Sequence, residues 1–296
     1  MLDSTRNSTN RQQIFADLGL LPFLEKRETV QIGNLPLHYE LYPHASDAPT
    51  LLFIPGIGTY SELYCELLAR LSDQGFNVVG VDLRGHGYSG GPRGRYRVEQ
   101  VIADLQQVMN HLEARFSGPF GLFGCSLGAR LGLALAEVDP RIRALLCHTL
   151  FLAEMPPDMW HSLGWSWLSL SGVFMPDFKV SFRSFVDVED MLATNPMGRY
   201  ASTDPLLVWD YPLSTLRSVY SYPSGILKSP LEIPSAIMIG DRDDVIRVEY
   251  ARDLAARSAQ PFDLLEIENA GHMLPFEHLE ATLETSSDWF ARALGR

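Results

Sequence analysis

The chain has 296 residues, of which 46% are hydrophobic and 20% charged, and this ordinary globular composition excludes a disordered, collagen-like or coiled-coil protein. Its formal net charge is −12, and its short basic cluster of Arg93, Arg95 and Arg97 follows glycines, so we expect no nucleic-acid partner. Three scattered cysteines without a CxxC motif suit a reducing compartment and exclude a disulfide framework or a thiolate zinc site.

The N-terminus is polar and lacks the apolar stretch of a signal peptide, and no run of about 20 apolar residues follows. We therefore expect a cytoplasmic protein without stable membrane anchoring. The first 28 residues are predicted to form an N-terminal extension. Within it, residues 14–24 are compatible with a short helix, although a glycine and a proline inside this segment oppose it.

Two segments of alternating polarity, residues 29–32 and 37–42, flank Gly33-Asn34 and predict a β-hairpin. Short continuous apolar runs then alternate with segments of helical periodicity, which predicts a mostly parallel sheet with helices on both faces. The expected strands are residues 50–54, 77–81, 120–123, 144–147, 235–239 and 263–267. The expected helices are approximately residues 62–74, 98–116, 127–137, 248–258 and 279–294.

This alternation stops between residues 148 and 231, a stretch rich in aromatic residues, serine and proline. We therefore predict a core formed by residues 29–147 and 232–296, with residues 148–231 inserted as a cap, or lid, before the last two strands. The fold class that follows is α/β.

The sequence Gly124-Cys125-Ser126-Leu127-Gly128 is a GxSxG motif, which is weak evidence by itself because it arises by chance. Here it follows an expected strand and begins an expected helix, the setting in which a sharp turn exposes a nucleophilic serine. The alternative interpretation is a glycine-rich helix start that packs against a strand. We predict that Ser126 is a nucleophile at the carboxyl edge of the sheet.

A serine hydroxyl is a poor nucleophile unless a base removes its proton, so a histidine must lie nearby. Among the eight histidines, His272 follows the last expected strand and is the predicted base. His86 lies in a glycine-flanked loop at the same edge and is kept as a less favoured base, because such a residue more often braces its loop. His148 ends a strand at this edge and could line the site, although chain order disfavours it as the base.

The carboxylate that orients the base should come between the serine and the histidine in sequence, at the end of the penultimate strand. Three aspartates compete there, and Asp243 is the predicted acid because a short turn would direct it inward. Asp241 is expected to brace the turn, and Asp244 to cap it or face solvent. All three remain candidates at this point.

The tetrahedral intermediate of acyl transfer carries a negative oxygen that needs two backbone N–H donors. The amide of Leu127, directly after the serine, is one candidate. The second should come from the loop Pro55-Gly56-Ile57-Gly58 after the first buried strand, and we choose the amide of Ile57.

These segments together resemble the α/β-hydrolase superfamily, and within it the branch of monoacylglycerol lipases and lysophospholipases. The resemblance covers residues 29 to 294 approximately, and it rests on residues 55–58, 81–90, 124–128, 240–243 and 271–272. It implies that Ser126, Asp243 and His272 form a catalytic triad, that Ile57 and Leu127 hold the oxyanion, and that no cofactor or metal is needed.

Two positions depart from that branch: Pro55 stands where a histidine is usual, and Cys125 stands where a histidine or tryptophan is frequent. Neither change removes a backbone donor. Related enzymes that attack haloalkanes or epoxides use an aspartate as nucleophile, so Ser126 argues against those activities.

Within the predicted cap, apolar residues recur at spacings of three and four, at Trp160, Leu163, Trp167, Leu170 and Phe174. We favour packing of this stripe against the core, and keep as the alternative an acyl-binding wall or a membrane-touching lid. Residues 159–176 contain no charged side chain, so no basic face is available to hold anionic lipid.

We therefore predict a serine hydrolase that cleaves small-molecule carboxylic esters with a lipophilic acyl group, through an acyl-enzyme on Ser126. Carboxylesterase, monoacylglycerol lipase and lysophospholipase activities all fit. A thioesterase, a carbon–carbon bond hydrolase and a small amide hydrolase are alternatives that use the same triad, and a non-catalytic binding module is the alternative from another class. The oligomeric state is not predicted.

Overall fold

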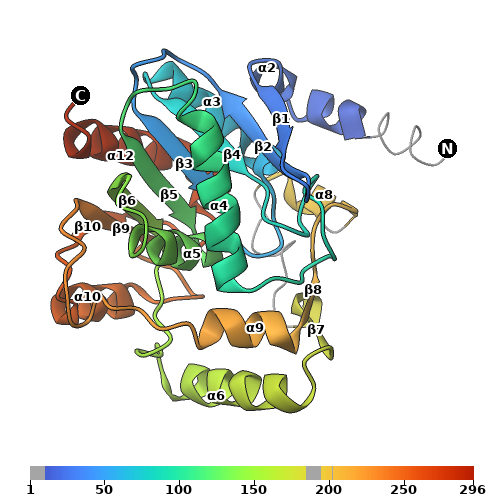
Figure 1. Cartoon of the computed structure of the whole chain (residues 1–296), viewed down its shortest axis with the longest axis vertical. Helices are drawn as coiled ribbons and strands as arrows, with labels where there is room; N and C mark the ends of the chain where they lie inside the picture. The colour runs from blue at the N-terminus through green and yellow to red at the C-terminus, as the bar shows by residue number, and fades with distance from the viewer. Residues whose placement is uncertain (1–10, 185–194, 202) are drawn as a thin grey trace, which may run out of the picture.

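A computed structural model describes residues 11–184, 195–201 and 203–296. Its centre is an eight-stranded sheet in the order β1-β2-β4-β3-β5-β6-β9-β10 (Figure 1). The strands are β1 (Glu28–Ile32), β2 (Leu37–Tyr42), β3 (Thr50–Ile54), β4 (Asn77–Val81), β5 (Phe120–Cys125), β6 (Ile142–His148), β9 (Ser235–Gly240) and β10 (Asp263–Ile267). Strands β1 and β2 form the predicted hairpin, and β2 pairs antiparallel with β4. All other neighbours in this sheet are parallel.

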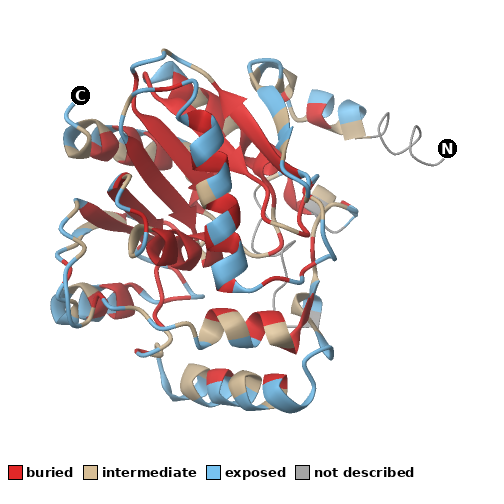
Figure 2. Cartoon of the chain, viewed as in Figure 1, coloured by how far each residue is buried: buried red, intermediate tan, exposed pale blue. Residues whose placement is uncertain are grey.

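Helices cover both faces of the sheet, as the alternation of strands and helices predicts. They are η1 (Ser61–Tyr64), α3 (Cys65–Asp73), α4 (Val98–Leu112), α5 (Leu127–Ala136), α10 (Val248–Arg257), α11 (Leu274–Glu277) and α12 (Leu279–Ala293). Helices α4, α5 and α10 contribute to the hydrophobic cluster on one face, and α3 and α12 to the cluster on the other. The central strands are buried on both faces (Figure 2), which explains why their apolar residues are consecutive rather than alternating with polar ones.

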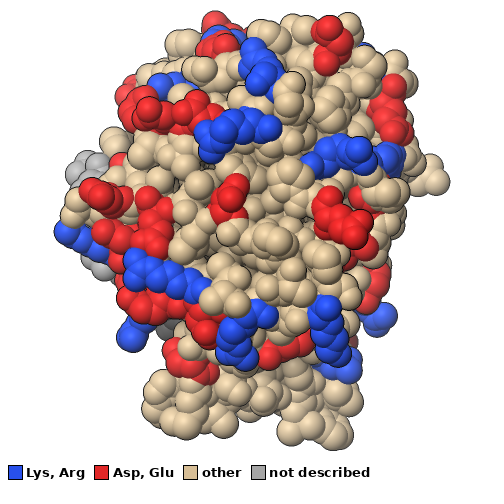
Figure 3. All heavy atoms as spheres, turned by 90° about the vertical axis from the view of Figure 1, so that its left-hand side faces the viewer, with Lys and Arg blue, Asp and Glu red and all other residues tan. Residues whose placement is uncertain are grey.

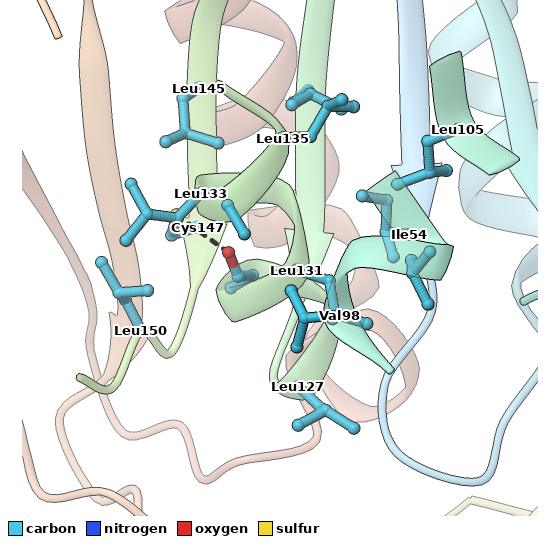
Figure 4. Packing of buried hydrophobic residues seen from close by; sticks show 14 of the residues in the cluster. Ile54, Val98, Leu105, Leu127, Leu131, Leu133, Leu135, Leu145, Cys147 and Leu150 are labelled. Carbon is cyan, nitrogen blue, oxygen red and sulfur yellow. Dashed lines mark hydrogen bonds between the residues drawn. The ribbon is translucent and has the colours of Figure 1, made fainter. Parts of the chain in front are cut away.

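Helix α5 shows how this packing is built (Figure 4). Leu127, Leu131 and Leu135 are buried in the same cluster as Ile54 of β3. The thiol of Cys147 lies 3.9 Å from the carbonyl oxygen of Ala129 and is fully buried. This dense packing holds the start of α5, and therefore the turn that precedes it, against the end of β3.

Three expected helices differ from the structure. Residues 62–74 form the 3-10 helix η1 and the α-helix α3 in place of one continuous helix. The segment predicted as one helix over residues 14–24 is broken: residues 11–17 are helical, and α2 (Leu21–Leu24) follows. Gly19 between them has φ +71°, a left-handed conformation that ends a helix. Helix α4 ends at Leu112 instead of residue 116, and turns then bury Phe116 in the core.

The described part of the chain between β6 and β9, residues 149–184, 195–201 and 203–234, lies across the carboxyl ends of the parallel strands (Figure 1). Its described elements are α6 (Met159–Phe174), β7 (Lys179–Ser181), η2 (Phe182–Ser184), α8 (Gly198–Ala201), β8 (Asp210–Pro212) and α9 (Leu213–Tyr220). Buried residues of this segment, including Trp165 and Leu213, belong to the same hydrophobic cluster as the sheet and α5. The predicted boundary between core and cap stays a prediction.

The favoured interpretation of the apolar stripe on α6 is wrong. Trp160, Leu163, Trp167, Leu170 and Phe174 are all exposed, by 52% to 76%. The side of α6 that packs inward carries Trp165 and Gly172 instead. At the lower end of the molecule, where α6 lies in Figure 1, the surface shows almost no charged side chain (Figure 3). No helix in the described ranges is long and apolar enough to cross a membrane.

Candidate active site

Ser126 occupies a strained turn between β5 and α5, with φ 51° and ψ −116°. A residue other than glycine rarely adopts these backbone angles, so the surrounding packing must hold Ser126 in them. Both flanking glycines explain how the turn closes. A Cβ atom on Gly124 would lie 2.4 Å from Cα of Ala129, and one on Gly128 would lie 2.1 Å from the carbonyl oxygen of Ile54. The GxSxG spacing is therefore a steric requirement of this turn.

The structure brings Ser126, His272 and Asp243 within hydrogen-bond distance, although they come from three separate loops. His272 Nδ1 lies 2.8 Å from Asp243 Oδ2, and His272 Nε2 lies 3.2 Å from Ser126 Oγ. An ionised carboxylate only accepts, so Nδ1 carries the proton and Nε2 is free to accept from the serine hydroxyl. This is the arrangement that a nucleophile, a base and an orienting acid require.

Asp243 is only 4% exposed, and each carboxylate oxygen has partners. Oδ1 accepts from the amides of Val245 and Ile246 at 2.9 and 3.0 Å, and Oδ2 also accepts from the hydroxyl of Thr149 at 3.0 Å. Burial raises the pKa of Asp243, but hydrogen bonds from His272 and from the Ile246 amide outweigh it, so the pKa lies below its usual value. Asp243 is therefore ionised at neutral pH.

The neighbouring aspartates have the roles expected of them. Asp241 accepts a hydrogen bond from the amide of Ala270 at 3.2 Å and so joins the loop after β9 to the loop after β10. Asp244 is exposed to solvent. Of the three competing carboxylates, Asp243 is the one that contacts His272.

His86 braces its loop. It is fully buried, with Nε2 2.6 Å from the hydroxyl of Tyr211 and Nδ1 3.1 Å from the carbonyl of Arg84. Burial lowers the pKa of His86 to about 4, so the ring is neutral. With both ring nitrogens engaged in these contacts, His86 is not placed to act as the base for Ser126.

His148 lies beside the site and lines the cavity in front of Ser126. Its ring centroid is 5.3 Å from that of His272, and Nδ1 is 3.3 Å from Cys125 Sγ. Burial lowers its pKa to about 3. The unusual Cys125 of the motif therefore contacts a neutral imidazole at the end of the neighbouring strand.

The loop after β3 contains one amide that remains available for a ligand. Gly56 N is 3.4 Å from the hydroxyl of Tyr64, Gly58 N donates to Tyr211 Oη at 2.8 Å, and Thr59 N donates to the carbonyl of Gly56. The amide of Ile57 has no acceptor among the described residues. The amide of Leu127 is in the same state at the start of α5, and both residues line the cavity.

The cavity in front of Ser126 has a volume of about 220 Å³ and is mainly apolar. Four aromatic residues of the β6–β9 segment line it: Phe151, Trp165, Phe182 and Tyr220. The other apolar lining residues include Tyr64, Met273, Pro275 and Phe276. None of the described lining residues is an aspartate or a glutamate, and no cluster suited to a metal ion occurs in the described chain.

Sequence reasoning missed two residues that support this site. Thr149, at φ 58°, donates to Asp243, and Tyr211 of β8 joins Gly58 to His86. The position of Thr149, directly after a buried strand at the active edge, was a signal that could have indicated it. No comparable signal exists for Tyr211, because its partners lie more than 100 residues away in the sequence.

Comparisons with known proteins identify the family and the fold. The family model described as serine aminopeptidase, S33, matches residues 46–278. The chain belongs to this family. The fold of this S33 family member is that of the α/β hydrolases.

Two solved structures share the fold of this S33 family member. A monoacylglycerol lipase from Paleococcus ferrophilus has a TM-score of 0.71 at 22% identity, and the match covers 87% of this chain and 99% of that one. A soluble variant of monoglyceride lipase from Saccharomyces cerevisiae, in complex with a substrate analogue, has a TM-score of 0.73 at 16% identity, covering 90% and 95%.

Among curated relatives, 3-oxoadipate enol-lactonase 2 from Acinetobacter baylyi is 32% identical over 117 residues, 39% of this chain and 42% of that protein. The chain thus matches about two fifths of the length of such relatives.

Proposed function

We propose that this protein is a serine hydrolase that cleaves carboxylic esters with a lipophilic acyl group through an acyl-enzyme on Ser126. The observation that carries the proposal is the continuous contact from Asp243 through His272 to Ser126 on an apolar cavity. Polar groups that converge on one point of an otherwise apolar pocket are typical of a site for a lipophilic substrate.

In this mechanism Ser126 Oγ attacks the ester carbonyl while His272 Nε2 takes its proton. The ionised Asp243 holds the imidazole in the required tautomer and stabilises the imidazolium. The amides of Ile57 and Leu127 donate hydrogen bonds to the oxyanion. Both amides are available, since neither has an acceptor among the described residues. The tetrahedral intermediate collapses, and His272 returns the proton to the leaving alcohol. Water, activated by His272, then hydrolyses the acyl-enzyme.

The lining of the cavity favours an ester over an aminopeptidase substrate. An aminopeptidase must bind an ammonium group, for which a carboxylate is the ordinary partner. The described lining residues include no aspartate or glutamate, and Asp243 already engages His272, Thr149 and two amides. Relatives named as lipases and as an enol-lactonase act on ester bonds, which supports the same choice.

Hydrolysis of p-nitrophenyl esters from acetyl to palmitoyl tests the proposal, with the wild type beside Ser126→Ala. We expect activity that peaks at one chain length and falls by at least about 10³-fold in the variant, because the nucleophile is lost. Ser166→Ala, on the exposed surface of α6, is the matched control and should retain full activity.

Near-wild-type activity in purified, folded Ser126→Ala would refute the mechanism. If Ser126 reacts with a fluorophosphonate but no ester is cleaved, the substrate is a different acyl compound, and thioesters are the next class to assay.

A further inference from the structure

A second cavity lies directly behind one wall of the cavity in front of Ser126. Its volume is about 300 Å³, and it shares three lining residues, Tyr64, Pro275 and Phe276, with the first cavity. Residues with atoms on both cavities form a partition between them. Beyond the partition, Leu18 and Met197 contribute apolar surface and Asp17 and Glu66 contribute carboxylates.

Tyr64 is the part of this partition that its own contacts hold in place. Its hydroxyl is 3.0 Å from the hydroxyl of Thr59 and 3.4 Å from the amide of Gly56, and its ring packs 4.7 Å from that of Phe53. Burial raises the pKa of Tyr64 well above its usual value, so the phenol stays neutral. Removing this side chain would disturb the loop that carries the Ile57 amide.

Pro275 and Phe276 complete the partition, and the Phe276 ring is the part that a substitution can remove. Phe276 lies on α11, four residues after His272, and its ring packs 4.9 Å from that of Tyr64 at an angle of 45°. Its backbone carbonyl accepts a hydrogen bond from Asn195 Nδ2 at 2.7 Å, a contact that does not involve the ring. The side chain is only partly buried.

We propose that Phe276 determines the size of the substrate group that faces it, by closing the cavity in front of Ser126 against the second cavity. This inference rests on the proposed ester hydrolysis. Without the ring, an alkyl chain of the substrate extends past Tyr64 into the second cavity. Asp17 and Glu66 in that cavity disfavour a chain that ends in a carboxylate.

The experiment compares the wild type with Phe276→Ala in two ester series: p-nitrophenyl esters of increasing acyl length, and acetates of increasing alcohol length. In one series we expect the longest accepted chain to increase, with kcat/KM gaining about fourfold for each added methylene that the second cavity buries. The series that responds identifies the half of the ester that faces Phe276. The readout is the longest accepted chain relative to shorter esters of the same variant, which a uniform change in activity does not alter.

Two further variants make the test specific. Phe182→Ala also removes an aromatic ring from the first cavity, but Phe182 does not line the second one, so it should not lengthen the accepted chain. Leu18→Trp in the Phe276→Ala background refills the second cavity and should restore the wild-type limit. Phe276→Leu provides a milder opening if the alanine variant does not fold.

The proposal is overturned if folded Phe276→Ala and Phe276→Leu keep the wild-type chain-length limit in both series. It is also overturned if Phe182→Ala extends the limit equally. A wild type that cleaves no ester of any length contradicts the proposed function instead. In that case the rate at which alkyl fluorophosphonates of increasing length label Ser126 still tests Phe276, because labelling requires only the nucleophile and the cavity.

Discussion

His86 and His148 are buried titratable residues that the proposed reaction does not use as a base. Burial lowers the pKa of His86 to about 4 and that of His148 to about 3. In the unfolded chain both pKa values are near 6.5. Their contribution to stability is therefore complete above about pH 6.5, and it is lost as the pH falls toward the folded-state values, because the unfolded chain binds protons that the native protein cannot.

We expect the free energy of unfolding to depend less on pH when His148 is replaced. Between pH 7 and pH 5, His148→Gln should lose about 2 kcal/mol less stability than the wild type, because it lacks one histidine whose pKa is lowered by burial. Urea denaturation at both pH values measures this difference, in which the other titratable groups cancel. The control is His44→Gln, which replaces an exposed histidine. If the free energy of unfolding of His148→Gln depends on pH as strongly as that of His44→Gln, the buried, neutral state of His148 is contradicted.

At the scale of elements, the turn from β5 to α5 depends on the close approach of α5 to the end of β3. A Cβ atom at Gly128 would meet the backbone carbonyl oxygens of Ile54 and Pro55 at 2.1 and 2.6 Å. Four residues further along the same helix, a Cβ atom at Gly132 would meet only side-chain methyl groups at 3.6 and 3.7 Å. The two glycines therefore have different reasons to be present.

We predict that Gly128→Ala destabilises the protein by about 2–4 kcal/mol and also removes activity, since backbone must move next to Ser126. Gly132→Ala should be neutral or stabilising by up to about 1 kcal/mol, because alanine is the better helix former and has room. Thermal denaturation and ester hydrolysis of both variants give the comparison. Equal effects of the two substitutions would show that steric contact with β3 is not the cause.

Helix α6 has two unlike faces. Trp165 is 9% exposed and lines the cavity in front of Ser126. Its ring packs at a tilt against those of Phe151 and Tyr220, with centroids 5.5 and 5.3 Å away. Trp160 on the same helix is 76% exposed. The helix therefore supplies an aromatic wall to the cavity on one side and an uncharged apolar surface on the other.

Trp165→Ala should lower the free energy of unfolding by about 3 kcal/mol and reduce activity toward lipophilic esters, because a buried ring is lost. Trp160→Ala should change stability by less than about 0.5 kcal/mol, and it should weaken the fluorescence of a bound apolar dye. Denaturation curves and dye titration of the two purified variants distinguish the faces. A larger loss of stability in Trp160→Ala would mean that the stripe packs against protein after all.

At the scale of the whole molecule, Arg11 joins three distant parts of the chain. Its guanidinium pairs with Glu62 of η1 and, at 3.0 Å, with Asp204 of the β6–β9 segment, and Asp204 also accepts from the hydroxyl of Tyr60. The side chains of Glu62 and Asp204 are only 6% and 2% exposed. Glu62 also pairs with Arg27. Removing Arg11 leaves Asp204 buried without the cation that pairs with it here.

We expect Arg11→Met to lower the free energy of unfolding by about 3 kcal/mol, because an uncompensated buried carboxylate is costly. Lys26→Met is the matched control: Lys26 pairs with Asp73 at 2.7 Å, but both side chains are about half exposed, so the loss should stay below about 1 kcal/mol. Urea denaturation of the two variants decides between these values. If both lose the same small amount, the Arg11 network does not connect these segments energetically.

Much of this molecule follows from the sequence alone, because short-range physics determines it. Continuous apolar runs predicted each of the central strands, since a parallel strand is buried on both faces. The GxSxG turn could be predicted for the same reason. Its two glycines leave room for the close approach of β5, α5 and the end of β3 that the motif brings together. The positions of Ser126, Asp243 and His272, each just after a parallel strand, then predicted which side chains would meet at one edge.

Only the tertiary structure decided which surfaces face one another. Periodicity shows that Trp160, Leu163 and Trp167 share one side of a helix, but it does not show whether that side points inward, and here it points to solvent. The contacts of Tyr211 with Gly58 and His86, and the partition of Tyr64 and Phe276 between two cavities, likewise join residues far apart in sequence. Local pattern determines which elements form and what each can bury, whereas the packing of all elements together determines what each one finally contacts.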